Sequence, residues 1–232
     1  MHAALALALA GASATAFAAA DPVAPSAPAF GYTPLAPGTY HLETIQRTTD
    51  AKLLDASGRG VRLARVVTGK VTLLTFFYTY CTDAWGCPYA YRLMTELRDR
   101  LSADPVVRAQ VRFVSISFDP TNDNPEALRL YSGALSAQRD RLEWRFLTAP
   151  DMRTLAPLLD DFGQDVEVER DARGQPTRMR NHMLKLFLID RAGFVREIYA
   201  LDTLNPPQLA NDVLTLVRET KRGRAPAASA AW

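Results

Sequence analysis

The sequence predicts an α/β fold in which a mostly parallel sheet is covered by helices on both faces. Strand-like and helix-like segments alternate along the middle of the chain, an order typical of such a sheet. Residues 71–80 and 111–118 are rich in β-branched and aromatic side chains without polar alternation, which indicates strands buried on both faces. At 232 residues and 48% hydrophobic composition, the chain can bury a full core as one domain with appendages.

The N-terminal 20 residues have the features of an export signal. Residues 3–20 are uncharged and rich in alanine and leucine, and small residues precede Asp21. We therefore expect a signal peptide at 1–20, cleaved near Ala18 or Ala20, and a periplasmic or otherwise exported protein. A retained membrane anchor is the alternative, but the segment is short and weakly hydrophobic for spanning a bilayer.

A proline- and alanine-rich stretch, residues 21–39, follows and is predicted to be an extended linker. The domain is predicted to occupy residues 40–220. Its first part contains short strand candidates on both sides of a glycine-containing turn at 56–60. These candidates are 41–45, 52–55 and 61–63.

Caps and turn residues set the order of the later elements. Pro88 suits the first position of a helix that continues through 89–101. Asn124 with Pro125, Asp151, and Pro206 with Pro207 are typical helix starts. The predicted helices run to about residues 138, 162 and 217. The remaining predictions are a strand at 144–147, an exposed β-hairpin at 163–180, paired strands at 184–189 and 194–199, and a disordered tail at 221–232.

Both cysteines of the chain lie on one loop between a buried strand and a helix. Cys81 follows the strand, and Cys87 lies at the N-terminus of the helix, where the dipole and free N–H groups favour a thiolate. The two residues could also be buried hydrophobes or an inert disulfide. The strand–loop–helix context favours reactive sulfurs and a redox-active pair. In an oxidising compartment the pair forms a disulfide unless a reductant or a metal holds it.

The formal charge of +2 argues against nucleic acid as a partner, because neutralising a phosphate backbone requires a dense basic surface. The basic residues near 221–224 are interpreted as part of a solvated tail.

His182 is the candidate third metal ligand. It precedes a predicted core strand, whereas His2 belongs to the signal and His41 to an edge strand. Two thiolates and an imidazole suit copper, because sulfur stabilises Cu(I) and imidazole also accepts Cu(II). Structural zinc requires a fourth protein ligand, and none is evident. Met179 and Met183 are interpreted as packing residues.

The chain resembles the SCO/SenC family from about Tyr40 to Val217. The resemblance rests on the segment 69–81 with Cys87-Pro88, on 113–120 with Asn124-Pro125, and on His182 ahead of 187–193. It implies a thioredoxin-like fold with a central mixed sheet, copper bound by Cys81, Cys87 and His182, and a metallochaperone role in cytochrome c oxidase assembly. The implied partner is the copper-site subunit of the oxidase or another copper acceptor. Export to an oxidising compartment adds a thiol reductant as an expected partner, and we expect the protein to be a monomer.

The cysteine loop departs from that family, which has three residues between its cysteines where this chain has five, 82–86. The longer loop can still close on one metal, because the entropy of loop closure grows slowly with length. Asp83 is the candidate for the aspartate often found in the family's loop. Trp85 is interpreted mainly as a packing residue.

Two enzyme classes compete with the copper interpretation. A thiol-disulfide oxidoreductase would use the same fold and location, but the C-x-x-C spacing and a proline directly before the strand near Leu184 are both absent. A peroxiredoxin-type peroxidase is disfavoured because no proline precedes Cys81 in the Tyr78–Tyr80 segment.

Overall fold

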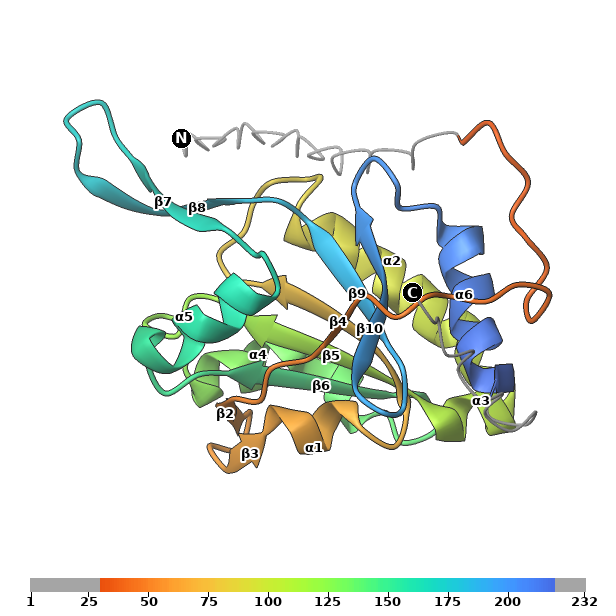
Figure 1. Ribbon diagram of the computed structural model, residues 1–232. Helices are drawn as coiled ribbons and strands as arrows, with labels where there is room; N and C mark the ends of the chain where they lie inside the picture. The colour runs from red at the N-terminus through yellow and green to blue at the C-terminus, as the bar shows by residue number, and fades with distance from the viewer. Residues whose placement is uncertain (1–29, 220–232) are drawn as a thin grey trace, which may run out of the picture.

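The computed structural model describes residues 30–219. The predicted signal peptide, the first part of the predicted linker and the predicted tail at 221–232 lie outside the described residues. The described chain forms a central eight-stranded sheet flanked by helices and a two-stranded sheet that projects from it (Figure 1). No helix within residues 30–219 has the length and apolar character needed to cross a membrane.

The elements have the following bounds. The strands are β1 Gln46–Arg47, β2 Lys52–Asp55, β3 Gly60–Arg62, β4 Val71–Phe77, β5 Val111–Ser117, β6 Glu143–Thr148, β7 Val166–Arg170, β8 Pro176–His182, β9 Lys185–Ile189 and β10 Phe194–Ala200. The helices are α1 Leu63–Val67, α2 Cys87–Ser102, α3 Pro105–Gln110, α4 Pro125–Ala137, α5 Met152–Asp161 and α6 Pro206–Glu219.

The central sheet is mixed, with the order β1-β10-β9-β4-β5-β6-β2-β3. Only the β4–β5 and β5–β6 pairings are parallel. The prediction of a mostly parallel sheet, made from the alternation of strand-like and helix-like segments, is therefore wrong. The reason is that β9 and β10 are joined by a tight turn, which makes antiparallel neighbours, and no crossover helix separates them. The mixed sheet implied by the family resemblance is confirmed.

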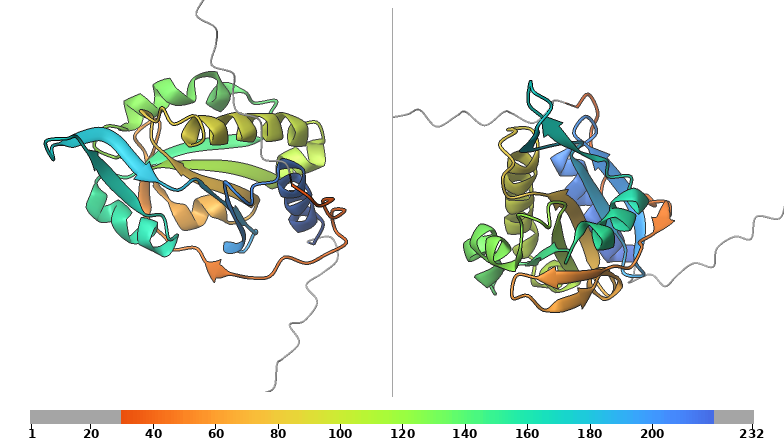
Figure 2. Two further views of the ribbon diagram at one scale, coloured as in Figure 1. Left: turned by 90° about the horizontal axis from the view of Figure 1, so that it is seen from above. Right: turned by 90° about the vertical axis from the view of Figure 1, so that its left-hand side faces the viewer.

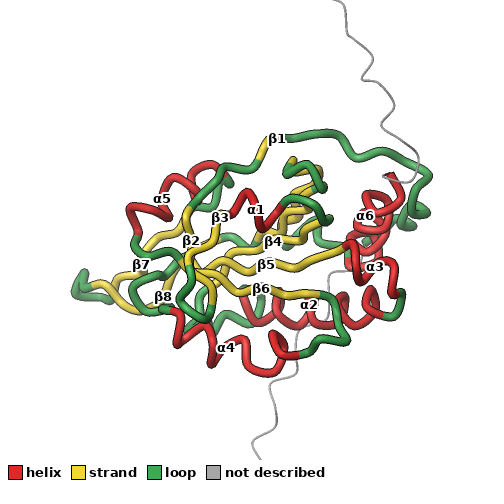
Figure 3. Tube along the Cα trace, turned by 90° about the horizontal axis from the view of Figure 1, so that it is seen from below, coloured by secondary structure: helices red, strands yellow, loops and turns green. Residues whose placement is uncertain are grey.

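The strands that lead to the candidate site are buried on both faces. Helices α2 and α4 cover one face of the sheet, and α1 and α5 cover the other (Figures 2 and 3). Neighbouring side chains of β4 point to opposite faces, so Phe77 stacks on Tyr131 of α4 while Phe76 meets Phe162 just after α5. This two-sided burial explains why β4 shows no polar alternation.

The strand before the cysteines is shorter than predicted, because β4 ends at Phe77 and does not reach Tyr80. The buried carboxylate of Asp123 accepts hydrogen bonds from the Thr79 backbone N–H, at 3.0 Å, and from the Thr79 hydroxyl. The backbone N–H of Thr79 is thereby diverted from sheet pairing. The chain turns toward the cysteine loop at this point.

Three further differences lie outside the site. The predicted strand 41–45 is replaced by β1, because the Arg196 guanidinium binds the carbonyls of Leu42 and Glu43. Leu63 was predicted to be the last residue of a strand, but it is the first residue of helix α1. The Asp50 carboxylate supports the start of this helix, because it accepts a hydrogen bond from the Ala64 backbone N–H. Helix α3 was not predicted, although Asp104 caps it.

Candidate metal centre

The three predicted ligands come together from two separate parts of the fold. Cys81 lies in the loop after β4 and is half-buried, and Cys87 is the first residue of α2 and is buried. His182 is the last residue of β8, in the two-stranded sheet. The structure therefore brings the ends of β4, α2 and β8 to one edge of the central sheet.

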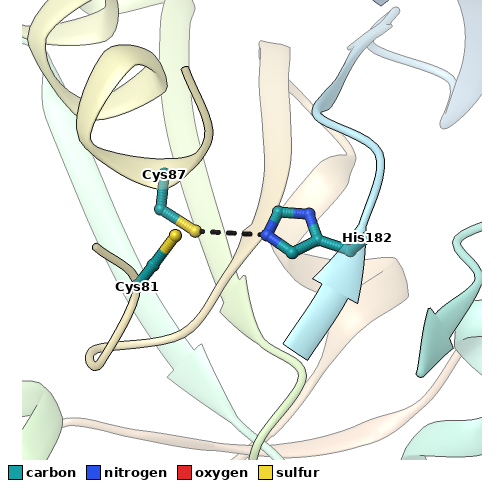
Figure 4. Close-up of side chains that lie close together, drawn as sticks. All are labelled: Cys81, Cys87 and His182. Carbon is teal, nitrogen blue, oxygen red and sulfur yellow. Dashed lines mark hydrogen bonds between the residues drawn. The ribbon is translucent and has the colours of Figure 1, made fainter. Parts of the chain in front are cut away.

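The donor atoms of these residues converge on one point (Figure 4). The Nε2 atom of His182 lies 3.7 Å from the Sγ atom of Cys87. All three donor atoms lie within 4.8 Å of one another, and both cysteines are free thiols. Metal–sulfur and metal–nitrogen bonds of about 2.0–2.3 Å would require only small movements to close on one ion.

The five-residue loop between the cysteines folds into a compact turn. The Asp83 carboxylate accepts a hydrogen bond from the Trp85 backbone N–H, at 3.0 Å. The Asp83 backbone carbonyl accepts one from the Gly86 N–H, at 2.9 Å. A Cβ atom at Gly86 would lie 3.3 Å from the Cys81 sulfur, so this position has no room for a larger residue without movement. The longer loop thus still places Cys81 beside Cys87.

The two cysteine thiols differ in pKa. The hydrogen bond from the Cys87 thiol, followed by that from His182, lowers the pKa of Cys81 to about 4 despite burial. The adjacent Cys81 sulfur and burial raise the pKa of Cys87. The helix N-terminus favours a thiolate at Cys87, but the first negative charge lies on Cys81, because one buried pair cannot hold two negative charges and the more exposed sulfur takes the first.

Aromatic rings hold the His182 imidazole. Its ring centroid lies 4.7 Å from that of Phe118 and 6.0 Å from that of Tyr78. Burial and the nearby cysteines raise the pKa of Tyr78 to about 12, so its hydroxyl stays protonated. These contacts restrict the orientations in which Nε2 can face the sulfurs.

A cavity of about 420 Å³ lies beside the imidazole. His182, Trp85, Met183 and Leu201 are among its lining residues. Trp85 packs against Tyr89, with ring centroids 5.5 Å apart, but it is also one of the exposed large hydrophobic residues. The cavity gives a second molecule access to one side of the site.

The donor set suits a soft metal with an open coordination position. Within residues 30–219, no fourth His, Cys, Asp or Glu joins the three donors. Two sulfurs and one imidazole match copper in both oxidation states and do not meet the four-ligand requirement of structural zinc.

The other histidine that the structure describes, His41, lies outside this cluster. His41 pairs with Glu219, at 3.0 Å, and His2 is outside the described residues. The Met179 sulfur lies 3.9 Å from the Tyr78 hydroxyl, and Met183 is exposed at the cavity.

Three residues that support the site were missed by the sequence reasoning: Tyr78, Asp123 and Arg180. Arg180 binds Asp119, at 3.4 Å, and both side chains are largely buried. The position of Tyr78 next to the cysteine strand was visible in the sequence, whereas the contacts of Asp123 and Arg180 depend on how separate segments meet.

Comparison with known proteins adds a family assignment. The SCO1/SenC family model matches residues 43–218. A curated relative, the SCO1 protein homolog of Bacillus subtilis, is 35% identical over 80 residues, which cover 34% of this chain and 38% of that protein. The matched part thus spans well under half the length of that relative.

Solved structures support the same fold. The copper-bound ScoI of Bradyrhizobium japonicum has a TM-score of 0.57 and 23% identity, covering 74% of this chain and 98% of that one. BsSco, described as a cytochrome c oxidase assembly protein of the Sco family with a disulfide switch, has the same TM-score and identity, with coverage of 77% and 98%.

Proposed function

The chain belongs to the SCO1/SenC family, and from that premise we propose that it is an exported copper-binding protein that delivers copper to, or helps to mature, the copper site of cytochrome c oxidase. The observation that carries the proposal is the convergence of Cys81, Cys87 and His182 donor atoms within 4.8 Å. Copper-bound and oxidase-assembly relatives support the choice of metal and pathway.

Cys81, Cys87 and His182 have different roles in copper binding. Cys81 is already a thiolate at neutral pH and meets the incoming ion first. Cys87 then loses its proton to become the second sulfur ligand, since the metal's charge offsets the repulsion between the sulfurs. His182 supplies the imidazole, which matters more for Cu(II) than for Cu(I).

Delivery requires that the copper remain open to a second protein. Three protein ligands leave room for a ligand of the acceptor, and the cavity beside His182 provides an approach. Transfer then proceeds by ligand exchange: the acceptor's donor binds, and the bonds to this protein break one after another. The acceptor is the copper-site subunit of the oxidase or another protein with soft donors.

Copper binding is tested on the reduced mature protein under anaerobic conditions, by elemental analysis and absorption. We expect one copper per chain. Cys81→Ser and Cys87→Ser should weaken both oxidation states, whereas His182→Ala should weaken Cu(II) more than Cu(I). His41→Ala is the matched control, because this exposed histidine lies outside the cluster. Binding that none of the three ligand substitutions changes would place the metal elsewhere.

Thiol-disulfide exchange is the second candidate function, and one observation favours it. A half-buried thiolate, Cys81, lies beside a buried thiol, Cys87, as in an attacking and resolving pair. Cys81 would attack a partner disulfide and release one partner thiolate. Cys87 would then lose its proton and displace the second partner sulfur, leaving a Cys81–Cys87 disulfide and a reduced partner. An external thiol reductant must regenerate the pair.

The two functions are separated by the response to His182→Ala. Disulfide reduction needs only the sulfurs and should survive this change, whereas Cu(II) binding should not. The assay follows reduction of a disulfide-bonded copper-site domain of the oxidase by the reduced protein. Loss of reduction in Cys81→Ser but not in His182→Ala would support the exchange activity.

Export is supported by the uncharged, alanine-rich residues 3–20. The mass of the protein recovered from the periplasm tests this part of the proposal, with cleavage expected after Ala18 or Ala20. We also propose that the protein is a monomer, which its mass in solution tests.

A further inference from the structure

His182 depends on a hairpin that is not part of the central sheet. Among the described residues, β7 and β8 pair with each other and with no strand of the eight-stranded sheet. Cys81, in contrast, lies in the loop that joins β4 to α2, and Cys87 is the first residue of α2. The distance between the imidazole and the sulfurs is therefore set by the short link from His182 to β9, which begins at Lys185, and by side-chain contacts at the base of the hairpin.

Arg180 makes the charged contact at that base. Its Nη2 atom lies 3.4 Å from Oδ2 of Asp119, which lies just beyond the end of β5 at Ser117, and the exposed fractions of the two side chains are 15% and 5%. Oδ2 of Asp119 also accepts a hydrogen bond from Asn122, at 2.8 Å, which fixes the carboxylate. The pair thus joins β8 to the end of the central sheet in a largely buried position.

The backbone of Arg180 makes a second contact with the sheet side. Its N–H donates a hydrogen bond to the Tyr78 hydroxyl, at 3.3 Å. The ring of Tyr78 also packs against the His182 ring. Two independent contacts therefore hold residue 180 against the segment that leads to Cys81.

The spacing along β8 transmits this constraint to the imidazole. Side chains two positions apart on a strand point to the same face, so Arg180 and His182 face the same side of the hairpin. Fixing Arg180 therefore fixes the position of His182 along β8 and the side of the hairpin from which its imidazole approaches the sulfurs.

We propose that Arg180, held by Asp119, is a positioning residue that keeps His182 within bonding reach of copper at the two cysteines; the copper role itself rests on the proposed function above. Arg180 does not touch the donor atoms of the site. Its effect is to pre-organise the imidazole, so that metal binding need not order the hairpin.

A metal-free experiment tests the positioning directly. In the reduced protein, the ring currents of Phe118 and Tyr78 shift the NMR signals of the His182 imidazole protons. Arg180→Met keeps an unbranched apolar chain but removes the charge, and it should move these signals toward those of a free histidine. Arg173→Met, in the exposed turn of the same hairpin, is the control and should leave them unchanged. Unchanged His182 signals in Arg180→Met would overturn the proposal.

Copper affinities provide the second measurement. Arg180→Met should lower the Cu(II) affinity by roughly 10- to 100-fold, as removal of supporting contacts does at other metal sites. Cu(I) affinity should fall less, because the two sulfurs are untouched. Arg180→Lys keeps the charge near Asp119 and should restore part of the Cu(II) affinity. Equal Cu(II) affinities for Arg180→Met and Arg173→Met would contradict the proposal.

A double variant distinguishes loss of His182 positioning from a general loss of stability. Arg180→Met leaves the Asp119 carboxylate buried without its cation, which is itself destabilising. Combining it with Asp119→Asn removes this unpaired charge and should recover unfolding stability but not Cu(II) affinity. Recovery of both would show that Arg180 acts on stability alone and would refute positioning. If the wild type binds no copper, the proposed function fails, while the His182 signals still decide the role of Arg180.

Discussion

Alkylation of the two cysteines should follow different pH profiles, and the shape of the Cys81 profile is the decisive feature. With a pKa of about 4, Cys81 is about 99% thiolate at pH 6, whereas a thiol with an ordinary pKa of about 8.5 is about 0.3% thiolate. The thiolate fraction alone would favour Cys81 by ~300-fold. A thiolate of low pKa is also a weaker nucleophile, however, and a Brønsted coefficient of about 0.4–0.5 removes ~100-fold of this gain.

The net rate advantage of Cys81 at pH 6 is therefore only ~3-fold, too small to identify a low pKa. The pH dependence is more informative. The alkylation rate of Cys81 should be nearly constant from about pH 5.5 to 8, whereas an ordinary thiol gains about tenfold per pH unit over this range. Cys87, whose pKa is raised by its neighbour and by burial, should react slowly throughout.

The assay is iodoacetamide labelling of the reduced, metal-free protein, with each site quantified by mass spectrometry. Cys87→Ala removes the hydrogen bond that contributes most to the low pKa of Cys81, so the rising part of the profile should move to higher pH. His182→Ala should move it in the same direction by less. A tenfold rise per pH unit in the wild type, or faster labelling of Cys87, would refute the assigned charge distribution.

Three further predictions concern the surroundings of the site and the sheet. Gly86→Ala places a Cβ atom 3.3 Å from the Cys81 sulfur and should lower copper affinity roughly tenfold, whereas Gly60→Ala, with open space around it, should not; equal affinities would count against the tight loop. Asp123→Asn weakens the buried hydrogen bonds that end β4 and should cost about 1–3 kcal/mol in denaturant unfolding, and an unchanged midpoint would show that they contribute little. Burial opposes ionisation of Glu143, but hydrogen bonding to Arg145 and the charge of Arg112 lower its pKa to about 2. The ionised Glu143 side chain therefore stabilises the fold above about pH 4.5, and this stabilisation is lost as the pH falls toward 2. Glu143→Gln should lower the free energy of unfolding by about 1–2 kcal/mol at pH 7, after allowance for solvent screening, and by little at pH 2. An equal loss at both pH values would contradict this.

The sequence was most informative where the pattern is local. The apolar runs of β4 and β5, the proline-started helices and the tight turn before β10 all depend on neighbouring residues, and each lies close to its predicted position. The convergence of Cys81, Cys87 and His182 was predictable because the cysteine loop follows one core strand and His182 precedes another, β9.

Contacts between distant segments were not predictable in the same way. The early end of β4 depends on Asp123, which lies after the next strand, and the start of α1 is supported by Asp50 from an earlier loop. The distribution of charge between the cysteines was not predictable from the sequence, because the helix N-terminus is local whereas the burial of Cys87 is a property of the whole core. Helix α3 is a different case: its Asp104 cap and Pro105 start are visible in the sequence and could have been used.

The separate hairpin that carries His182 makes the centre modular. Its tip, around the turn at 171–175, extends away from the core in Figure 1, so insertions or deletions there need not disturb the packing of the main domain. The sulfur half and the imidazole half of the site can therefore diverge at different rates among related chains. Grafting residues 166–182 between such chains would exchange the imidazole half while both cysteines and their loop stay native.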